Sequence, residues 1–230
     1  MLKFKKLPFT KNQTFITSDT HYSHANICKA TTSWDAGYRD FDSLEEMNSS
    51  IVQNINDLVK ENDCLIHCGD WSFGGKQNVW NFRKQIACKN IYLQIGNHDQ
   101  YLQETTKLYI SDEDVYLATK LGIPTHFDTT YYLYTTDCFN DVNDIAYYQI
   151  EDQQIVFSHY PFVSWYHSTK GVWNLSGHEH SQMEEKYYYN KSMDVGIDAA
   201  FKMFGEYRPF SFIEIEELLE KKIVNLLNHH

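Results

Sequence analysis

The sequence predicts an α/β fold, in which short strands alternate with helices, and two observations support this prediction. Short apolar runs alternate along the chain with stretches in which apolar residues recur at helical spacing. Two Ser-x-x-Glu signatures, which are typical of helix starts, precede the clearest helical stretches. No repeat and no glycine- or proline-rich linker divides the 230 residues, so we expect one domain over residues 1–230.

Five apolar runs have the length and composition of buried strands. They are TFITSD at 14–19, CLIHCGD at 64–70, IYLQIGN at 91–97, QIVFSH at 154–159 and VWNLSG at 172–177. Alternation in the second run turns Cys64, Ile66 and Cys68 to one face. This pattern favours buried core cysteines over a metal-binding pair.

Two amphipathic helices are predicted where a capping signature precedes apolar residues at helical spacing. Ser43 with Glu46 begins the first helix, which should pack on the sheet. Ser211 with Glu214 begins the second, which closes the chain. The apolar positions are Leu44, Met47, Ile51, Ile55, Leu58 and Val59 in the first helix, and Ile215, Leu218, Leu219, Ile223, Leu226 and Leu227 in the second.

Residues 127–150 form a segment rich in Tyr and Asp that has no single period. We expect this segment to be an insertion in the domain, either a hairpin or a lid. Its tyrosines could stack a nucleobase. Alternating tyrosines are more often the half-buried face of a strand, and we favour this interpretation because strand propensity alone predicts the enrichment in aromatic residues.

Composition argues against several classes of protein. The formal charge of −11 argues against a protein that holds long nucleic acid, which requires a basic surface. No apolar run is long enough to span a membrane, and the N-terminus lacks the apolar stretch of a signal peptide, so we expect no membrane partner and a cytoplasmic location. Five scattered cysteines also suit a reducing compartment. His229 and His230 are interpreted as remnants of a purification tag.

Polar side chains follow each of the five predicted strands. The carboxyl ends of strands in an open α/β sheet line one crevice, so residues far apart in sequence would meet there. These residues are Asp19, His21, Asp70, Asn97, His98, Asp99, His159, His178 and His180. Singly, each fits a turn or a buried core histidine. Turn chemistry does not call for histidine at four strand ends, so we prefer a shared site.

The donor types in this set suit divalent metals. Carboxylate oxygens, amide oxygens and imidazole nitrogens bind borderline divalent ions, and the set exceeds what one four-coordinate ion can use. We therefore expect two ions that share a bridging ligand. A carboxylate can bridge two ions and an imidazole cannot, so Asp70 is the natural bridge among the central residues.

The spaced motifs resemble those of the calcineurin-like metallophosphoesterase superfamily. Five blocks carry the resemblance in the family's order: D-x-H at 19–21, G-D at 69–70, G-N-H-D at 96–99, a lone histidine at 159 and G-H-x-H at 177–180. SDTHYSHANI at 18–27, SHYP at 158–161, MDVGID at 193–198 and YRPFS at 207–211 resemble one bacterial and phage branch of the family. The resemblance covers nearly the whole chain and implies two packed mixed β-sheets flanked by helices.

The resemblance also implies roles for individual residues around a bridging Asp70. The implied ligands are Asp19, His21 and His180 for one ion, and Asn97, His159 and His178 for the other. His98 would face the phosphate, and Asp99 would orient His98 by a hydrogen bond. His24 and Asn26 could hold the phosphate or shape the pocket, although His24 could equally cap a nearby helix and Asn26 could satisfy a turn. Mn²⁺ is the first expected ion, with Fe, Ni, Zn and Co as alternatives.

The predicted activity is hydrolysis of a small phosphoester, with a nucleotide-like phosphodiester as the first expected substrate. The expected mechanism is in-line attack by a hydroxide that bridges two divalent ions. Two alternatives stay open: a nuclease acting on longer strands, against which the acidic charge counts, and a non-catalytic metal-binding scaffold of the same fold. A retained His98 argues against the scaffold, which has no need for an acid beside a phosphate site. Ester type, native metal and oligomeric state are left open.

Overall fold

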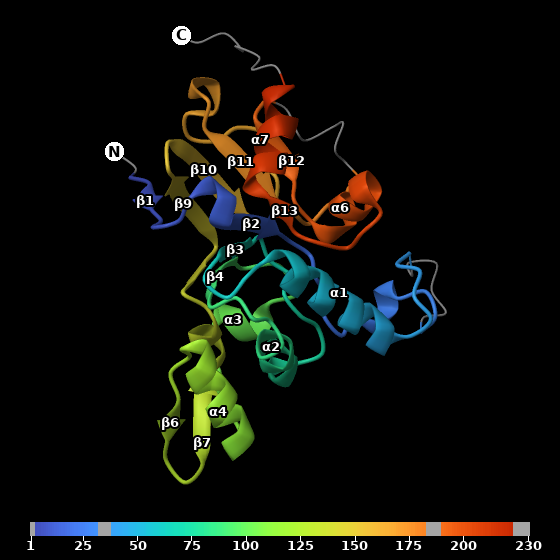
Figure 1. Cartoon of the computed structure of the whole chain (residues 1–230), viewed down its shortest axis with the longest axis vertical. Coiled ribbons are helices and arrows are strands. Elements are labelled where there is room, and N and C mark those ends of the chain that lie inside the picture. The colour runs from blue at the N-terminus through green and yellow to red at the C-terminus, as the bar shows by residue number, and fades with distance from the viewer. Residues whose placement is uncertain (1–2, 32–37, 183–189, 223–230) are drawn as a thin grey trace.

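The computed structural model describes residues 3–31, 38–182 and 190–222. Two five-stranded sheets pack together with helices around them, and a smaller three-stranded sheet with one helix extends at the bottom of Figure 1, away from both termini. The predicted architecture of two packed mixed sheets flanked by helices is confirmed. No helix in these ranges has the length and hydrophobicity needed to cross a membrane.

The first sheet has the strand order β13-β2-β3-β4-β8. Four of its strands run parallel to one another, and β13 is antiparallel to β2. Its strands are β2 at Thr14–Thr17, β3 at Cys64–His67, β4 at Asn90–Gln94, β8 at Asp141–Asn143 and β13 at Phe210–Ser211. β2, β3 and β4 overlap the first three predicted runs. Because these strands are parallel, their carboxyl ends lie at one edge of the sheet.

The second sheet has the strand order β1-β9-β10-β11-β12. β10 is antiparallel to β9 and parallel to β11, which is in turn parallel to β12. Its strands are β1 at Lys5–Lys6, β9 at Ile145–Ile150, β10 at Gln153–Ser158, β11 at Trp173–Ser176 and β12 at Ser192–Asp194. The other two predicted runs are β10 and β11, which bring His159 and the 177–180 motif to one side.

Alternation along β3 divides the core into two parts. Cys64, Ile66 and Cys68 lie in the cluster between the two sheets, as predicted. Leu65 points the other way, into a cluster that includes Met47 of helix α1 (Leu44–Leu58). All five cysteines are buried and free.

Helices cover the outer face of the first sheet and complete the apolar cluster that contains Leu65 and Met47. Both predicted helix starts are confirmed: the Ser43 hydroxyl accepts a hydrogen bond from the Glu46 N–H at 3.0 Å, and the Ser211 hydroxyl accepts one from the Glu214 N–H at 3.2 Å. The predicted apolar positions 223–227 and the two terminal histidines lie outside the described residues. The helices are α1 at Leu44–Leu58, α2 at Lys76–Arg83, α3 at Gln100–Gln103, α4 at Asp112–Leu121, α6 at Ile197–Phe204 and α7 at Phe212–Glu220, with 3₁₀ turns η1 at Lys11–Gln13, η2 at Ala25–Ile27, η3 at Thr135–Cys138 and η4 at Ser168–Lys170.

The Tyr- and Asp-rich segment 127–150 is divided between two parts of the fold. β7 at Tyr131–Tyr134 pairs with β5 at Lys107–Tyr109 and with β6 at His126–Phe127 in the small sheet. β8 and β9 are instead strands of the two main sheets. The hairpin interpretation therefore fits only the first part of the segment, because residues 141–150 are integral to the sandwich. A lid function stays a prediction.

Candidate metal centre

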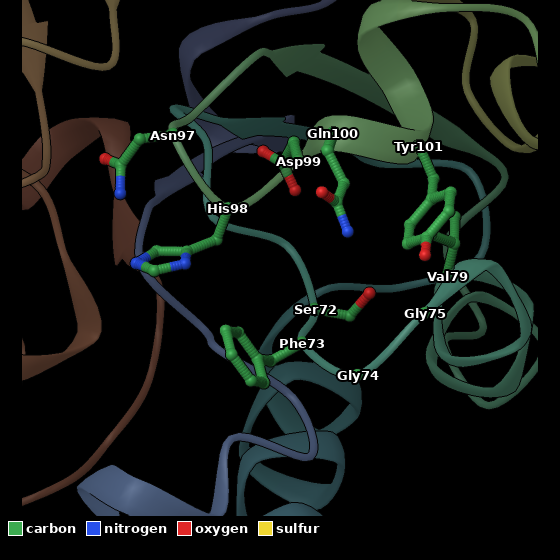
Figure 2. A pocket seen from close by; sticks show the side chains of 10 residues that line it. All are labelled: Ser72, Phe73, Gly74, Gly75, Val79, Asn97, His98, Asp99, Gln100 and Tyr101. Carbon is green, nitrogen blue, oxygen red and sulfur yellow. The ribbon is translucent and has the colours of Figure 1, made fainter.

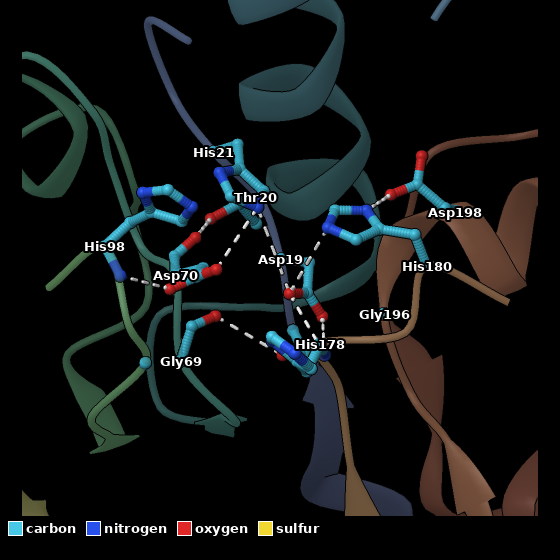
Figure 3. A network of polar contacts seen from close by, with 12 residues as sticks. Asp19, Thr20, His21, Gly69, Asp70, His98, His178, His180, Gly196 and Asp198 are labelled. Carbon is cyan, nitrogen blue, oxygen red and sulfur yellow. Dashed lines mark hydrogen bonds and ion pairs between the residues drawn. The ribbon is translucent and has the colours of Figure 1, made fainter. Parts of the chain in front are cut away.

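The predicted ligands come together at the carboxyl ends of five strands. Figure 3 shows five of them: Asp19, His21, Asp70, His178 and His180. Three residues form what we call the His180 half: Asp19, His21 and His180. Nε2 of His21 lies 3.9 Å and Nε2 of His180 lies 3.8 Å from Asp19 Oδ1. This spacing could hold one metal ion.

The His180 half contains a free ligand atom. His21 Nε2 is buried and has no hydrogen-bond partner among the described residues. Burial also keeps the pKa of His21 well below its ordinary value, so the ring is neutral and its lone pair is available. An orphaned buried nitrogen that faces carboxylates is costly by itself and fits a metal ligand.

The remaining predicted ligands form the Asn97 half: Asn97, His159 and His178. Asn97 Oδ1 lies 2.9 Å from His159 Nε2 and 3.0 Å from His178 Nδ1, and these two nitrogens are 3.2 Å apart. His159 Nδ1 lies 2.9 Å from the Cys68 carbonyl oxygen, which can only accept a hydrogen bond. The ring proton therefore lies on Nδ1. This contact leaves Nε2 unprotonated and free to bind a metal.

Asp70 lies between the two halves. Its Oδ2 is 3.3 Å from His21 Nε2 and 3.5 Å from His159 Nε2. Its Oδ1 accepts a hydrogen bond from the backbone N–H of His98 at 2.8 Å. One buried carboxylate therefore contacts a ligand of each half, as a bridging residue must.

Five of the candidate ligands adopt a left-handed backbone conformation, which is unfavourable for residues other than glycine. Their φ angles are 55° at Asp19, 47° at His21, 57° at Asp70, 73° at His178 and 46° at His180. Strain of this kind costs about 1–3 kcal/mol per residue and gathers at functional sites. The backbone is bent at these positions to bring the side chains together.

Two motif glycines are required by close packing around the ligands. A Cβ on Gly96 would lie 2.2 Å from Asp70 Oδ1, and a Cβ on Gly177 would lie 2.1 Å from Asp19 Oδ2. Both distances are far below van der Waals contact. The G-N and G-H pairs in the sequence therefore keep a side chain out of the space that the carboxylates occupy.

A buried ion pair that the sequence analysis did not identify supports the His180 half. His180 Nδ1 lies 2.6 Å from Asp198 Oδ2, and Arg39 donates to both oxygens of Asp198 at 2.9 and 2.7 Å. Arg39 also donates to the backbone carbonyls of Asp19 and Thr20 at 2.7 and 3.0 Å. The pair thus ties helix α6 to the ligand loop after β2.

Electrostatics at this pair favour a protonated Nδ1 on His180. Burial by itself lowers the pKa of His180, but the hydrogen bond to Asp198 and the charge of Asp19 outweigh burial and raise the pKa to about 9. Burial raises the pKa of Asp198, and the neighbouring Arg39 outweighs that effect and holds the pKa well below its usual value. Asp198 therefore stays ionised and accepts a hydrogen bond from the Nδ1–H of His180, and a metal bound at Nε2, which faces Asp19, would displace the second ring proton.

His98 and His24 lie beside His21 at the edge of the centre, and both are half-buried. The His98 ring is 5.2 Å from the His21 ring and 5.6 Å from the His24 ring, between centroids. The His24 ring stacks on Phe73 at 4.0 Å, and its Nδ1 is 3.1 Å from His21 Nδ1. His24 is the residue that precedes η2, but its side chain does not cap that turn. Asn26 is exposed in η2, and no contact joins it to the centre among the described residues.

The contacts of the Asp99 side chain are with the backbone of neighbouring loops. Its carboxylate accepts hydrogen bonds from the backbone N–H groups of Asp70, Trp71 and Gly96 at 2.7, 3.0 and 2.9 Å. Burial raises the pKa of Asp99 to about 6, although these donors act in the opposite direction. No contact between the Asp99 carboxylate and the His98 ring is found among the described residues, and the predicted orienting role of Asp99 stays a prediction. The carboxylate fixes the loops that carry Asp70 and Asn97.

Comparisons with known proteins agree with this geometry. A family model described as calcineurin-like phosphoesterase matches residues 13–188. The uncharacterized protein MJ1445 of Methanocaldococcus jannaschii is 24% identical over 221 residues, which cover 93% of this chain and 96% of that protein. The crystal structure of AQ665, a protein of unknown function from Aquifex aeolicus, matches with a TM-score of 0.50 and 17% identity over 89% of this chain and 98% of that one. At that identity the likeness to AQ665 shows the fold alone.

Proposed function

The chain belongs to the calcineurin-like phosphoesterase family, and on that premise we propose that it uses two metal ions to hydrolyse a small phosphoester, with a nucleotide-like phosphodiester as the first expected substrate. The observation that carries the proposal is the position of Asp70. Its Oδ2 is within 3.5 Å of a ligand nitrogen in each half of the centre. A structural single-ion site would not require a second set of ligands on the far side of a shared carboxylate.

The two halves supply suitable ligands for two divalent ions. The His180 half and Asp70 would hold one ion, and the Asn97 half and Asp70 the other. When bound, such a pair supplies Lewis-acid stabilisation of phosphate oxygens and acidifies a water for attack on phosphorus. The mixed oxygen and nitrogen donors suit Mn, Fe, Co, Ni or Zn, and we expect Mn²⁺ to support activity in vitro.

His98 is placed to act on the leaving group. Its backbone N–H is held by Asp70, while its ring lies against His21 and Phe73, with centroids 5.2 and 5.4 Å away. A ring nitrogen of His98 lies within 4.8 Å of ligand atoms of His21 and Asp70, at the edge of the centre. From that position the ring would hold or donate a proton at the ester oxygen that departs.

The experiment is hydrolysis of bis-(4-nitrophenyl) phosphate and 4-nitrophenyl phosphate by metal-stripped protein, before and after reloading with Mn²⁺. We expect turnover only after reloading, with the diester preferred. His98→Ala should lower kcat by about 10²–10⁴-fold, because positioned acid catalysis is typically worth that much. Metal content measured on the same samples should stay unchanged.

His126→Ala is the matched control, because His126 is a partly exposed histidine in the small sheet, paired with Asp137 at 3.4 Å. This variant should keep full activity. Full activity of His98→Ala would remove His98 from the proposed role. Metal binding without turnover of either ester would contradict the hydrolase and favour a scaffold.

A further inference from the structure

A cavity of about 320 Å³ adjoins the metal centre (Figure 2). Its walls are the loop at residues 72–75 and the start of α3. Asn97 and His98 form the end nearest the metal ligands, and Val79 and Tyr101 form the other end. The cavity is large enough for an organic group of nucleoside or sugar size.

The lining carries no cationic side chain. Among the described residues that line the cavity there is no lysine and no arginine; they are Ser72, Phe73, Gly74, Gly75, Val79, Asn97, His98, Asp99, Gln100 and Tyr101. The one carboxylate, that of Asp99, is occupied by three backbone N–H groups. Lys76 lines the adjoining groove and donates to the Lys107 carbonyl at 3.0 Å. A phosphate placed inside the cavity would therefore lack a cationic partner.

Three polar groups of the lining have no side-chain hydrogen bond to the described part of the protein: the Ser72 hydroxyl, the Gln100 amide and the Tyr101 hydroxyl. Ser72 is 6% exposed overall, and its hydroxyl oxygen is not one of the fully buried atoms without a partner, so solvent in the cavity reaches it. Figure 2 shows its hydroxyl and the Gln100 amide directed into the space between the loop and α3. A few convergent polar groups beside aromatic rings are typical of a site for a neutral organic ligand.

We propose that this cavity binds the uncharged alcohol part of the substrate, a hydroxyl-bearing group of nucleoside or sugar size that leaves with the ester oxygen. This inference rests on the proposed function. His98 lines both the metal centre and the cavity, so the oxygen it faces belongs to the group inside the cavity. Hydrolysis then adds water to phosphorus, breaks the bond to that oxygen, and leaves the alcohol protonated in the cavity.

The test compares two substrates that differ in the charge of the leaving group. Thymidylyl-(3′→5′)-thymidine is cleaved at a phosphodiester bond and releases a neutral nucleoside, whereas dithymidine 5′,5′-diphosphate is cleaved at a phosphoanhydride bond and releases thymidine 5′-monophosphate, a charged leaving group. Each variant is compared with the wild-type protein on the same substrate, because an ester and an anhydride differ in intrinsic reactivity. Products are separated by chromatography, and kcat/KM is measured with Mn²⁺-loaded protein.

Gln100 offers a matched pair with Gln103, because both are exposed residues of the four-residue helix α3 and only Gln100 lines the cavity. Gln100→Ala should lower kcat/KM for thymidylyl-thymidine about fivefold to tenfold, as expected for the loss of one uncharged hydrogen bond. Gln103→Ala should leave it unchanged. Gln100→Lys should raise kcat/KM for the diphosphate about tenfold, because it supplies the missing cation.

Several results would overturn the inference. They are equal effects of the two alanine variants, no gain for the diphosphate with Gln100→Lys, or no hydrolysis of thymidylyl-thymidine by a wild-type protein that hydrolyses bis-(4-nitrophenyl) phosphate. Failure of the wild-type protein on every ester would instead contradict the proposed hydrolase itself.

Discussion

The two halves of the metal centre differ in charge and in the groups that support their histidines. The His180 half has a carboxylate of its own, Asp19, and its His180 contacts a second carboxylate, Asp198, at 2.6 Å. In the Asn97 half the oxygen ligand is a neutral amide, and His159 contacts a backbone carbonyl at 2.9 Å. Asp19 is fully buried, whereas Asn97 is exposed.

These differences predict unequal affinities for the two ions. More negative charge among the ligands raises the affinity for a divalent cation, and a carboxylate behind a histidine makes its free nitrogen more basic. The His180 half should therefore fill first and retain its ion, and the Asn97 half should exchange its ion more readily. The centre would thus combine one site that retains its ion with one site that exchanges it, although the donor types in the two halves are similar.

The largest effect is expected from Asp70→Asn, because a single oxygen of Asp70 lies within 3.5 Å of a ligand nitrogen in each half. Asparagine keeps an oxygen that can accept from the His98 N–H but removes the negative charge between the ions. Both metal affinities should fall, and hydrolysis of bis-(4-nitrophenyl) phosphate should fall by about 10³-fold or more. Calorimetric titration of metal-stripped protein, beside the activity assay, measures both quantities.

Loss of only one of the two ions in Asp70→Asn would contradict the assignment of Asp70 to both halves. If Asp70→Asn removed one ion and left the other at wild-type affinity, Asp70 would belong to a single half. The centre would then be two neighbouring sites without a bridge.

A smaller and one-sided effect is expected from Asp198→Asn. The asparagine can still accept from His180, but the charge that makes the ligand nitrogen basic is lost. Loss of such a supporting partner typically lowers metal affinity about 10–100-fold, and here the loss should affect only the tighter of two calorimetric steps. The weaker step reports on folding, because an unfolded chain would lose both ions.

Asp137→Asn is the matched control for this measurement. Asp137 also pairs with a histidine, His126, but the pair lies in and beside the small sheet. The Asp137→Asn variant should leave both metal-binding steps unchanged. Equal weakening of both steps by Asp198→Asn would mean that the Arg39–Asp198 pair supports the fold generally and does not position His180.

The clustering of the candidate ligands could be predicted from the sequence because each of them follows a predicted strand. The order and direction of the strands then determine where those strand ends lie. Residues that directly follow β2, β3, β4, β10 and β11 must lie near the same edge of the sandwich, whatever their separation along the chain. The motif glycines add a second signal, since Gly96 and Gly177 have no room for a Cβ beside the carboxylates. The division of the ligands into two sets followed from the family resemblance, and the distances agree with it.

The supporting residues could not be predicted in the same way. Arg39 lies in a loop without a periodic or motif signal, and Asp198 lies 159 residues away at the start of α6, where the MDVGID motif marks its position but not its partner. For Asp99, the family resemblance implied a hydrogen bond to His98, whereas the turn after β4 directs its carboxylate to three backbone N–H groups. Side-chain direction in a turn depends on tertiary contacts that local sequence does not reveal.

The smallest effect is expected from Tyr38→Phe, which separates the two groups that contact His180. The Tyr38 hydroxyl lies 2.6 Å from His180 Nδ1 and 3.4 Å from Asp198 Oδ2. If the Nδ1 proton is donated to Asp198, the hydroxyl adds one further hydrogen bond to a carboxylate that Arg39 already holds. Its loss should weaken the tighter metal-binding step by about twofold to tenfold. A loss as large as that of Asp198→Asn would mean that Tyr38 fixes the orientation of His180, and that Asp198 serves mainly to balance the charge of Arg39.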